Sequence, residues 1–149
     1  RMACFDRPTD KILEDVQTLN AETGVAPYPG YYARSDIIPT LTACLWTTDA
    51  ALVATSSVNA RYHQASRFAG YVFKGSTSVK ATQRGMSLGK LVNAQVLLES
   101  QNAMGWAHAI SQVQPDNIAS VKTISAAGFT RNPQLVTLGI VAKGSVFTR

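Results

Sequence analysis

Residues 77–91 read TSVKATQRGMSLGKL, a β-prone stretch that ends near Val79 and continues through a turn of small residues into a helical pattern. Such a turn leaves backbone N–H groups without partners at a helix N-terminus, where the helix dipole adds partial positive charge. Gly85 and Gly89 have no Cβ, so a ligand can approach the backbone closely. Three basic residues add full charges: Lys80, Arg84 and Lys90. The stretch predicts a pyrophosphate-binding turn, with an ordinary tight strand-to-helix connection as the alternative.

Two common phosphate-binding loops are excluded for this turn. No Gly-Lys-Ser/Thr follows four spacer residues, as a Walker loop requires, and the full Gly-x-Gly-x-x-Gly of a dinucleotide-binding fold is missing.

The distribution of charge also favours an anionic ligand. The formal net charge is +5, and residues 50–98 contain no Asp or Glu but six basic residues. Such a stretch raises the local concentration of anions, so a nucleic acid, an acidic membrane surface or a phosphorylated cofactor each fits. A solvated basic face without a partner is the alternative. Nucleic acid is disfavoured because no basic cluster is interleaved with aromatic residues.

Length and composition predict one compact domain over residues 1–149. The chain is 46% hydrophobic and 15% charged, which excludes disordered and coiled-coil classes. No uncharged apolar run reaches the roughly 18 residues of a membrane helix, and no signal peptide is recognisable, so a cytoplasmic location is the default expectation. The start at Arg1 is compatible with the C-terminal part of a longer chain. Cys4 and Cys44 lack metal-ligand spacing and are expected to be buried apolar side chains.

Hydrophobic periodicity predicts a mixed α/β domain. Helices are expected at 9–22, at 87–102 and from Pro115 to a cap at Gly128. Strands are expected at 40–48, 51–58, 68–80, 106–113 and 135–141. Residues 24–39 are expected to form an ordered loop, and Trp46 and Trp106 are expected to pack in the core.

The turn resembles the signature of the GCN5-related N-acetyltransferases (GNAT), which is Arg/Gln-x-x-Gly-x-Gly/Ala after a strand ending in Val. Arg84 and Gly89 match it, whereas Ser87 replaces the middle glycine. A second family block, Asn-x-x-Ala/Ser followed eight residues later by Gly-Phe, is similar to residues 117–120 and 128–129. Two blocks at the family's usual separation are far more specific than either block alone.

The resemblance covers about residues 41–141 and implies a fold and a reaction. The fold would be a mixed, mostly antiparallel central sheet with flanking helices, in which the parallel strands at 68–79 and 106–113 splay apart. The reaction would move an acetyl group from acetyl-CoA directly to the primary amine of a small molecule or peptide, without a metal, nucleic acid or membrane. A regulatory module that binds acyl-CoA without turnover is the alternative. The oligomeric state is left open, with a homodimer among the alternatives.

The resemblance also implies roles for individual residues. Backbone groups at the strand end would bind the pantetheine arm, and the Val79 N–H would polarise the thioester carbonyl. The other cofactor contacts would come from Thr77, Ser78, Arg84, Gly85, Met86, Ser87, Leu88, Gly89, Lys90, Asn117 and Ser120.

Acetyl transfer also needs a group that deprotonates the amine and one that protonates the leaving thiolate. Gln112 and Ile124 stand where the family often has a glutamate base and a tyrosine acid, and neither can move a proton. His108 is a candidate base because imidazole ordinarily titrates near neutral pH, with a structural histidine as the alternative. Tyr71 is a candidate acid, with core packing as the alternative.

Overall fold

A computed structural model of the chain describes residues 1–25 and 38–134. In these residues five strands form one sheet in the order β1-β2-β3-β4-β5. The strands are β1 (Met2–Phe5), β2 (Thr40–Trp46), β3 (Leu52–Asn59), β4 (Tyr71–Val79) and β5 (His108–Ser111). The first three neighbouring pairs are antiparallel, and β4 pairs with β5 in parallel. The expectation of a mixed, mostly antiparallel sheet with one parallel pair is confirmed.

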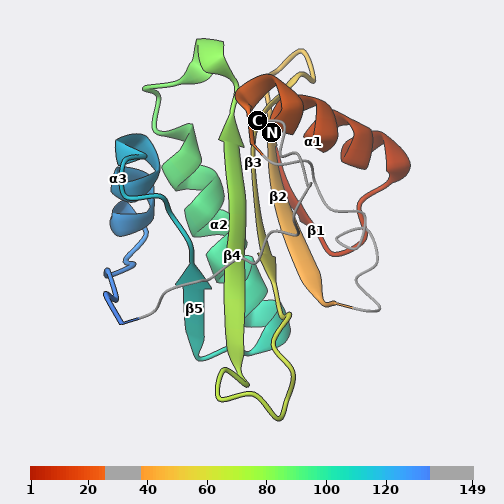
Figure 1. Cartoon of the computed structure of the whole chain (residues 1–149). Helices are drawn as coiled ribbons and strands as arrows, with labels where there is room; N and C mark the ends of the chain where they lie inside the picture. The colour runs from red at the N-terminus through yellow and green to blue at the C-terminus, as the bar shows by residue number, and fades with distance from the viewer. Residues whose placement is uncertain (26–37, 135–149) are drawn as a thin grey trace, which may run out of the picture.

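Three helices flank the sheet: α1 (Asp10–Thr23), α2 (Leu88–Met104) and α3 (Ile118–Ala126). The helix α1 covers one face, and α2 with α3 covers the other (Figure 1). A 3₁₀ turn, η2 (Ala81–Gln83), connects β4 toward α2. No helix in the described ranges is long and apolar enough to cross a membrane.

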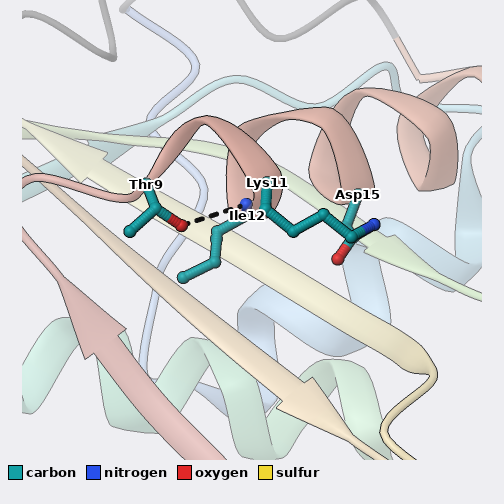
Figure 2. Close-up of polar contacts among 4 residues, drawn as sticks. All are labelled: Thr9, Lys11, Ile12 and Asp15. Atoms are coloured by element: carbon teal, nitrogen blue, oxygen red, sulfur yellow. Dashed lines mark hydrogen bonds and ion pairs between the residues drawn. The ribbon is translucent and has the colours of Figure 1, made fainter.

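Local interactions define α1. Thr9 is the N-cap, and its Oγ1 accepts a hydrogen bond from the Ile12 N–H at 3.4 Å (Figure 2). On the exposed side of the helix, Lys11 Nζ pairs at 2.5 Å with Oδ1 of Asp15, which lies one turn further along. Gly24 ends the helix with φ +68°, a left-handed conformation that suits glycine. The apolar side of α1 buries Val16 against the sheet, as the predicted amphipathic pattern requires.

The main core lies between α2 and the sheet. Val92 and Val96 of α2 are completely buried, and they pack with Val58 of β3 and Val72 of β4. Fully burying each valine contributes roughly 1.5–3 kcal/mol. The apolar side of α2 thereby fixes the helix, and the turn that precedes it, against the middle of β4.

Most predicted elements are confirmed, with shifted ends. The strand β4 begins at Tyr71 rather than residue 68, because a turn through Gly70 (φ +79°) precedes it. The strand β5 covers 108–111 of the expected 106–113. The short strand β1 was not predicted. The expected strand at 135–141 and residues 26–37 of the expected loop lie outside the described residues.

The aromatic and cysteine expectations are largely confirmed. Trp46 packs edge-on against Phe5, and the Trp106 indole N–H donates to Ser100 Oγ at 3.0 Å beside the main core. Cys44 is fully buried, and burial raises the pKa of its thiol to about 12. Cys4 is only partly buried, and the pKa of its thiol is raised to about 11, again mainly by burial. Both thiols are therefore protonated at neutral pH.

Candidate active site

An extra residue in β4 changes its pairing with β3. Ser56 pairs with Thr77, whereas Val58 pairs with Lys74, so one residue of β3 faces two residues of β4, Gly75 and Ser76. This is a β-bulge, which bends a strand and breaks its ladder locally. The parallel pairing with β5 ends at the same point, since Lys74 and Ser111 form its last pair. Beyond the bulge β4 continues to Val79 with no described strand on that side (Figure 1).

The register shows which backbone groups of β4 face this open side. The Lys80 N–H donates to the Val53 carbonyl at 2.8 Å. Because bonded and non-bonded pairs alternate in an antiparallel ladder, Ser78 also exchanges its backbone hydrogen bonds with β3. The N–H groups of Thr77 and Val79 point the other way, toward the gap. Ser78, which was expected to offer its backbone to pantetheine, therefore gives its backbone groups to the sheet.

The Ser78 side chain is also occupied within the protein. Its hydroxyl donates to the Asn20 side-chain oxygen of α1, and both residues are buried. Ser78 thus ties β4 to α1 on the face opposite α2.

A cleft of about 160 Å³ opens where β4 and β5 separate. It is lined by the β4 bulge, the end of β5 and one side of α3: Phe73, Lys74, Gly75, Ser76, Thr77, Ser111, Gln112, Ser120 and Ile124. The cleft brings Thr77 and Ser120, both expected at the cofactor, together with Gln112 and Ile124, the two positions where the family often has its proton-carrying residues. Val79 lies beyond this lining, toward the turn that leads to α2.

The other two catalytic candidates lie at the far end of the strand pair. Tyr71 and His108 are register partners at the start of β4 and β5. Tyr71 precedes Val79 by eight residues, which is roughly 26 Å along an extended strand. Neither residue lines the cleft. The structure brings Tyr71 and His108 together, but it does not bring them to Val79.

The turn between β4 and α2 has the geometry of an anion site. Gly85 and Ser87 both have positive φ, +84° and +59°, and Ser87 is the N-cap of α2 but makes no side-chain capping bond. In the described part of the chain, the N–H groups from Gly85 to Gly89 have no hydrogen-bond acceptor. Concave backbone segments with adjacent N–H groups of this kind bind anions. The side chains of Arg84, Met86, Ser87 and Lys90 are exposed around the turn, and Leu88 is half-buried.

The missing side chain of Gly89 faces the interior of the protein. A Cβ at this position would meet methyl groups of Thr123, Val79 and Thr77 at 3.4, 3.5 and 3.8 Å. The missing side chain therefore faces α3 and β4 rather than the solvent side of the turn. Gly89 allows the first turn of α2 to pack close to the strand.

Asn117 and Ser120 interact with each other. The Asn117 side-chain oxygen accepts the Ser120 N–H at 3.1 Å and caps α3. This oxygen therefore stabilises the helix, and among the two residues Ser120 is the one that reaches the cleft.

Lys74, for which the sequence predicts no role, lies in a buried polar network. The residue is 2% exposed, and its Nζ donates to Thr77 Oγ1. Thr77 Oγ1 and Ser56 Oγ both donate to Asn93 Oδ1 at 2.8 Å. Burial lowers the pKa of Lys74 to about 7. The available sequence signal was the alternation in β4, where Val72 and Lys74 share one face.

Within residues 1–25 and 38–134, no three or more His, Cys, Asp and Glu side chains are grouped so that they could hold a metal ion.

Comparisons by sequence give no match, either to a protein-family model or to a curated protein. Comparisons of structure do. Aminoglycoside N-acetyltransferase AAC(6')-Iy in complex with CoA has a TM-score of 0.68 at 16% identity, covering 95% of this chain and 100% of that one. The apo aminoglycoside 6'-N-acetyltransferase AAC(6')-IG from Acinetobacter haemolyticus has a TM-score of 0.68 at 13% identity, covering 95% and 98%.

A third similar structure is that of an enzyme named for a protein substrate. The ribosomal-protein-S18-alanine N-acetyltransferase from Escherichia coli has a TM-score of 0.63 at 12% identity, covering 89% of this chain and 79% of that one. At these identities the likeness shows the fold. The chain has the fold of the GNAT acetyltransferases, as its turn and its second sequence block implied.

Proposed function

We propose that this chain, on its GNAT fold, binds acetyl-CoA and transfers the acetyl group directly to a primary amine. The observation that carries the proposal is the separation of β4 from β5 at the Gly75–Ser76 bulge. It leaves backbone N–H groups of β4 facing a cleft, next to a helix N-terminus with no side-chain cap. Backbone donors that no strand satisfies are suited to a ligand that contains amides.

The positions of these groups suggest how CoA would be held. Its pyrophosphate would lie on the N–H groups from Gly85 to Gly89, near Arg84 and Lys90. Its pantetheine amides would extend along β4 and bond the Val79 N–H. The thioester carbonyl would accept the Thr77 N–H, because Thr77 lines the cleft and Val79 does not. This moves the proposed oxyanion donor from Val79 to Thr77.

The chemistry within the cleft would be direct attack. The amine nitrogen attacks the thioester carbon, the carbonyl oxygen gains negative charge, and the C–S bond breaks as the amide forms. A preorganised N–H donor aimed at the developing oxyanion contributes about 3 kcal/mol of transition-state stabilisation. The acceptors named for the similar structures are an aminoglycoside and an alanine of a ribosomal protein. For this chain we propose an amine acceptor of either kind, small molecule or peptide.

A second candidate function rests on Gln112 and Ile124. Both line the cleft, and neither side chain can carry a proton. A module that binds acyl-CoA and regulates without turnover would need no proton carrier there.

A thiol-release assay separates the two candidates. The purified protein is incubated with acetyl-CoA and a panel of primary amines that includes aminoglycosides and peptides with N-terminal alanine. If the chain is an acetyltransferase, CoA should be released above the buffer rate with at least one amine. Acetyl-CoA binding without release favours the regulatory module. Absence of binding in a calorimetric titration contradicts both.

A further inference from the structure

Lys74 is buried and has no counter-ion among residues 1–25 and 38–134. It lies between β3, which carries no charged residue, and β5 and α2, and it is 2% exposed. The titratable groups on the surrounding elements are Lys90 and Glu99 on α2, His108 on β5, Lys122 on α3 and Tyr71 on β4 itself. In the described ranges none of them forms an ion pair with Lys74, and the carboxylates of α1 belong to the opposite face. A charged ammonium in this position is costly, since burying an unpaired charge is strongly unfavourable.

The buried amine has a polar route to the cleft. Lys74 Nζ bonds Thr77 Oγ1, and both residues line the cleft where β4 and β5 separate. Thr77 is the residue whose N–H faces the same space. A substrate amine placed against Thr77 would therefore be one hydroxyl away from the lysine nitrogen.

Asn93 holds this arrangement in place. Its Oδ1 accepts from both Thr77 and Ser56, while its buried Nδ2 has no partner among the described residues. The three side chains come from α2, β4 and β3. The Thr77 hydroxyl accepts from Lys74 and donates to Asn93 in this arrangement. When the lysine is neutral, the hydroxyl can turn its hydrogen to the lysine nitrogen, and because a hydroxyl both donates and accepts it can then relay a proton.

We propose that Lys74 is the proton acceptor of the transfer reaction, and that it takes the proton of the substrate ammonium through the Thr77 hydroxyl. This inference rests on the proposed function. In the step, the ammonium R–NH₃⁺ gives one proton to the relay, and the neutral Lys74 amine becomes an ammonium. The freed R–NH₂ attacks the thioester, and the second proton lost by its nitrogen goes to the departing thiolate. Lys74 then returns its proton to water.

Two observations beyond the geometry agree with this role. Burial lowers the pKa of Lys74 to about 7, so that much of the amine is neutral at physiological pH. The usual family positions for proton carriers are occupied by Gln112 and Ile124, and among the described residues that line the cleft Lys74 is the one with a titratable side chain.

The test is the pH profile of kcat/KM with an acceptor found in the thiol-release assay. The wild type should gain activity as pH rises through about 7. Lys74→Met keeps the length of the side chain but should lose this rise, the limb of the pH profile near pH 7. Its kcat/KM should fall 10²- to 10⁴-fold at pH 7. Thr77→Val should behave likewise, and Thr77→Ser should restore the limb because it keeps the hydroxyl. Lys11→Met, a distant exposed lysine, is the control and should match the wild type.

Three outcomes overturn the inference while the proposed function stands. One is a Lys74→Met variant that keeps the limb near pH 7. Another is a Lys74 ¹³Cε resonance, assigned by its absence from Lys74→Met, that titrates above pH 9 in the free protein. The third is an acetyl group on Lys74 after incubation with acetyl-CoA, since the lysine would then be a nucleophile. If no amine gives thiol release, the proposed acetyl transfer is contradicted, and this inference falls with it.

Discussion

Tyr71 and His108 lie opposite each other on the parallel strands β4 and β5, with ring centroids 4.7 Å apart and planes inclined by 32°. The contact closes the end of the strand pair that is farthest from the cleft. Three residues later the pairing stops at Lys74 and Ser111. The aromatic contact therefore holds β5 to β4 at one end while the two strands separate at the other.

This position predicts a structural effect for His108→Ala. Losing the ring contact should lower the free energy of unfolding by about 1 kcal/mol, the usual value of an aromatic pair. The kcat/KM should stay within about twofold of the wild type at every pH, because His108 is remote from the cleft. Urea denaturation and the thiol-release assay measure the two quantities. A tenfold or larger loss of kcat/KM in a folded variant would mean that the His108 imidazole takes part in the reaction.

The uncapped N-terminus of α2 predicts an effect of charge on CoA binding. Ser87→Asp should fold normally, since Asp tolerates positive φ and is a favourable N-cap at the positive end of a helix. Its carboxylate would occupy the proposed pyrophosphate position, so the rise in melting temperature that CoA gives to the wild type should disappear. Ser87→Asn, which is nearly isosteric and neutral, should keep it. An undiminished rise in Ser87→Asp would show that the pyrophosphate binds elsewhere.

The packing around Gly89 predicts that alanine is tolerated there. The added Cβ would make ordinary contacts of 3.4 to 3.8 Å with Thr123, Val79 and Thr77. Alanine also has the higher helix propensity, so the variant should gain up to about 1 kcal/mol in the free energy of unfolding. The affinity for CoA, measured by calorimetry, should be unchanged. A tenfold loss of affinity would mean that the ligand itself needs the space at Gly89.

Lys74 predicts how stability depends on pH. Its pKa is lowered to about 7 in the folded protein and is near 10.4 when unfolded, so between these values the unfolded state binds more protons. The free energy of unfolding should therefore rise with pH in this window, by about 1.4 kcal/mol per unit at most. Below pH 7 the folded protein carries the full cost of the buried ammonium.

Lys74→Met removes this dependence. The variant should be more stable than the wild type at pH 6, and the difference should shrink as pH rises to 9. Chemical denaturation at both pH values measures it, with Lys11→Met as the control. Equal differences at the two pH values would mean that Lys74 titrates normally.

The sequence predicted the helices and longer strands because each presents a continuous apolar periodicity. The left-handed cap expected at Gly128 is confirmed by its φ of +89°, whereas the cap at Gly24 was not predicted. The strand β1 was missed because four residues are too few to establish a pattern. Periodicity also gives no register, and only the register shows that the backbone of Ser78 bonds β3 while the N–H groups of Thr77 and Val79 point to the open side of β4.

The role of Lys74 could not be read from the sequence for a related reason. In a regular strand, Lys74 and Thr77 would point to opposite faces, since their separation is odd. The bulge places both on the α2 side, where they bond each other and reach Asn93. A lysine among apolar residues on a strand otherwise indicates a solvated edge. Nothing in the sequence marks the position of the bulge apart from Gly75.

The two residues of the bulge also determine what may be changed in this protein. Deleting either Gly75 or Ser76 would restore uniform pairing with β3, and Thr77 and Ser78 would stay opposite Ser56 and Thr55 with their side chains on the present faces. What would be lost is the local bend and the break in the ladder, so β4 could continue its pairing with β5 past Lys74 and Ser111, and the cleft between the two strands would close. Substitutions at these two sites should therefore be tolerated far better than a change in the number of residues between Lys74 and Thr77.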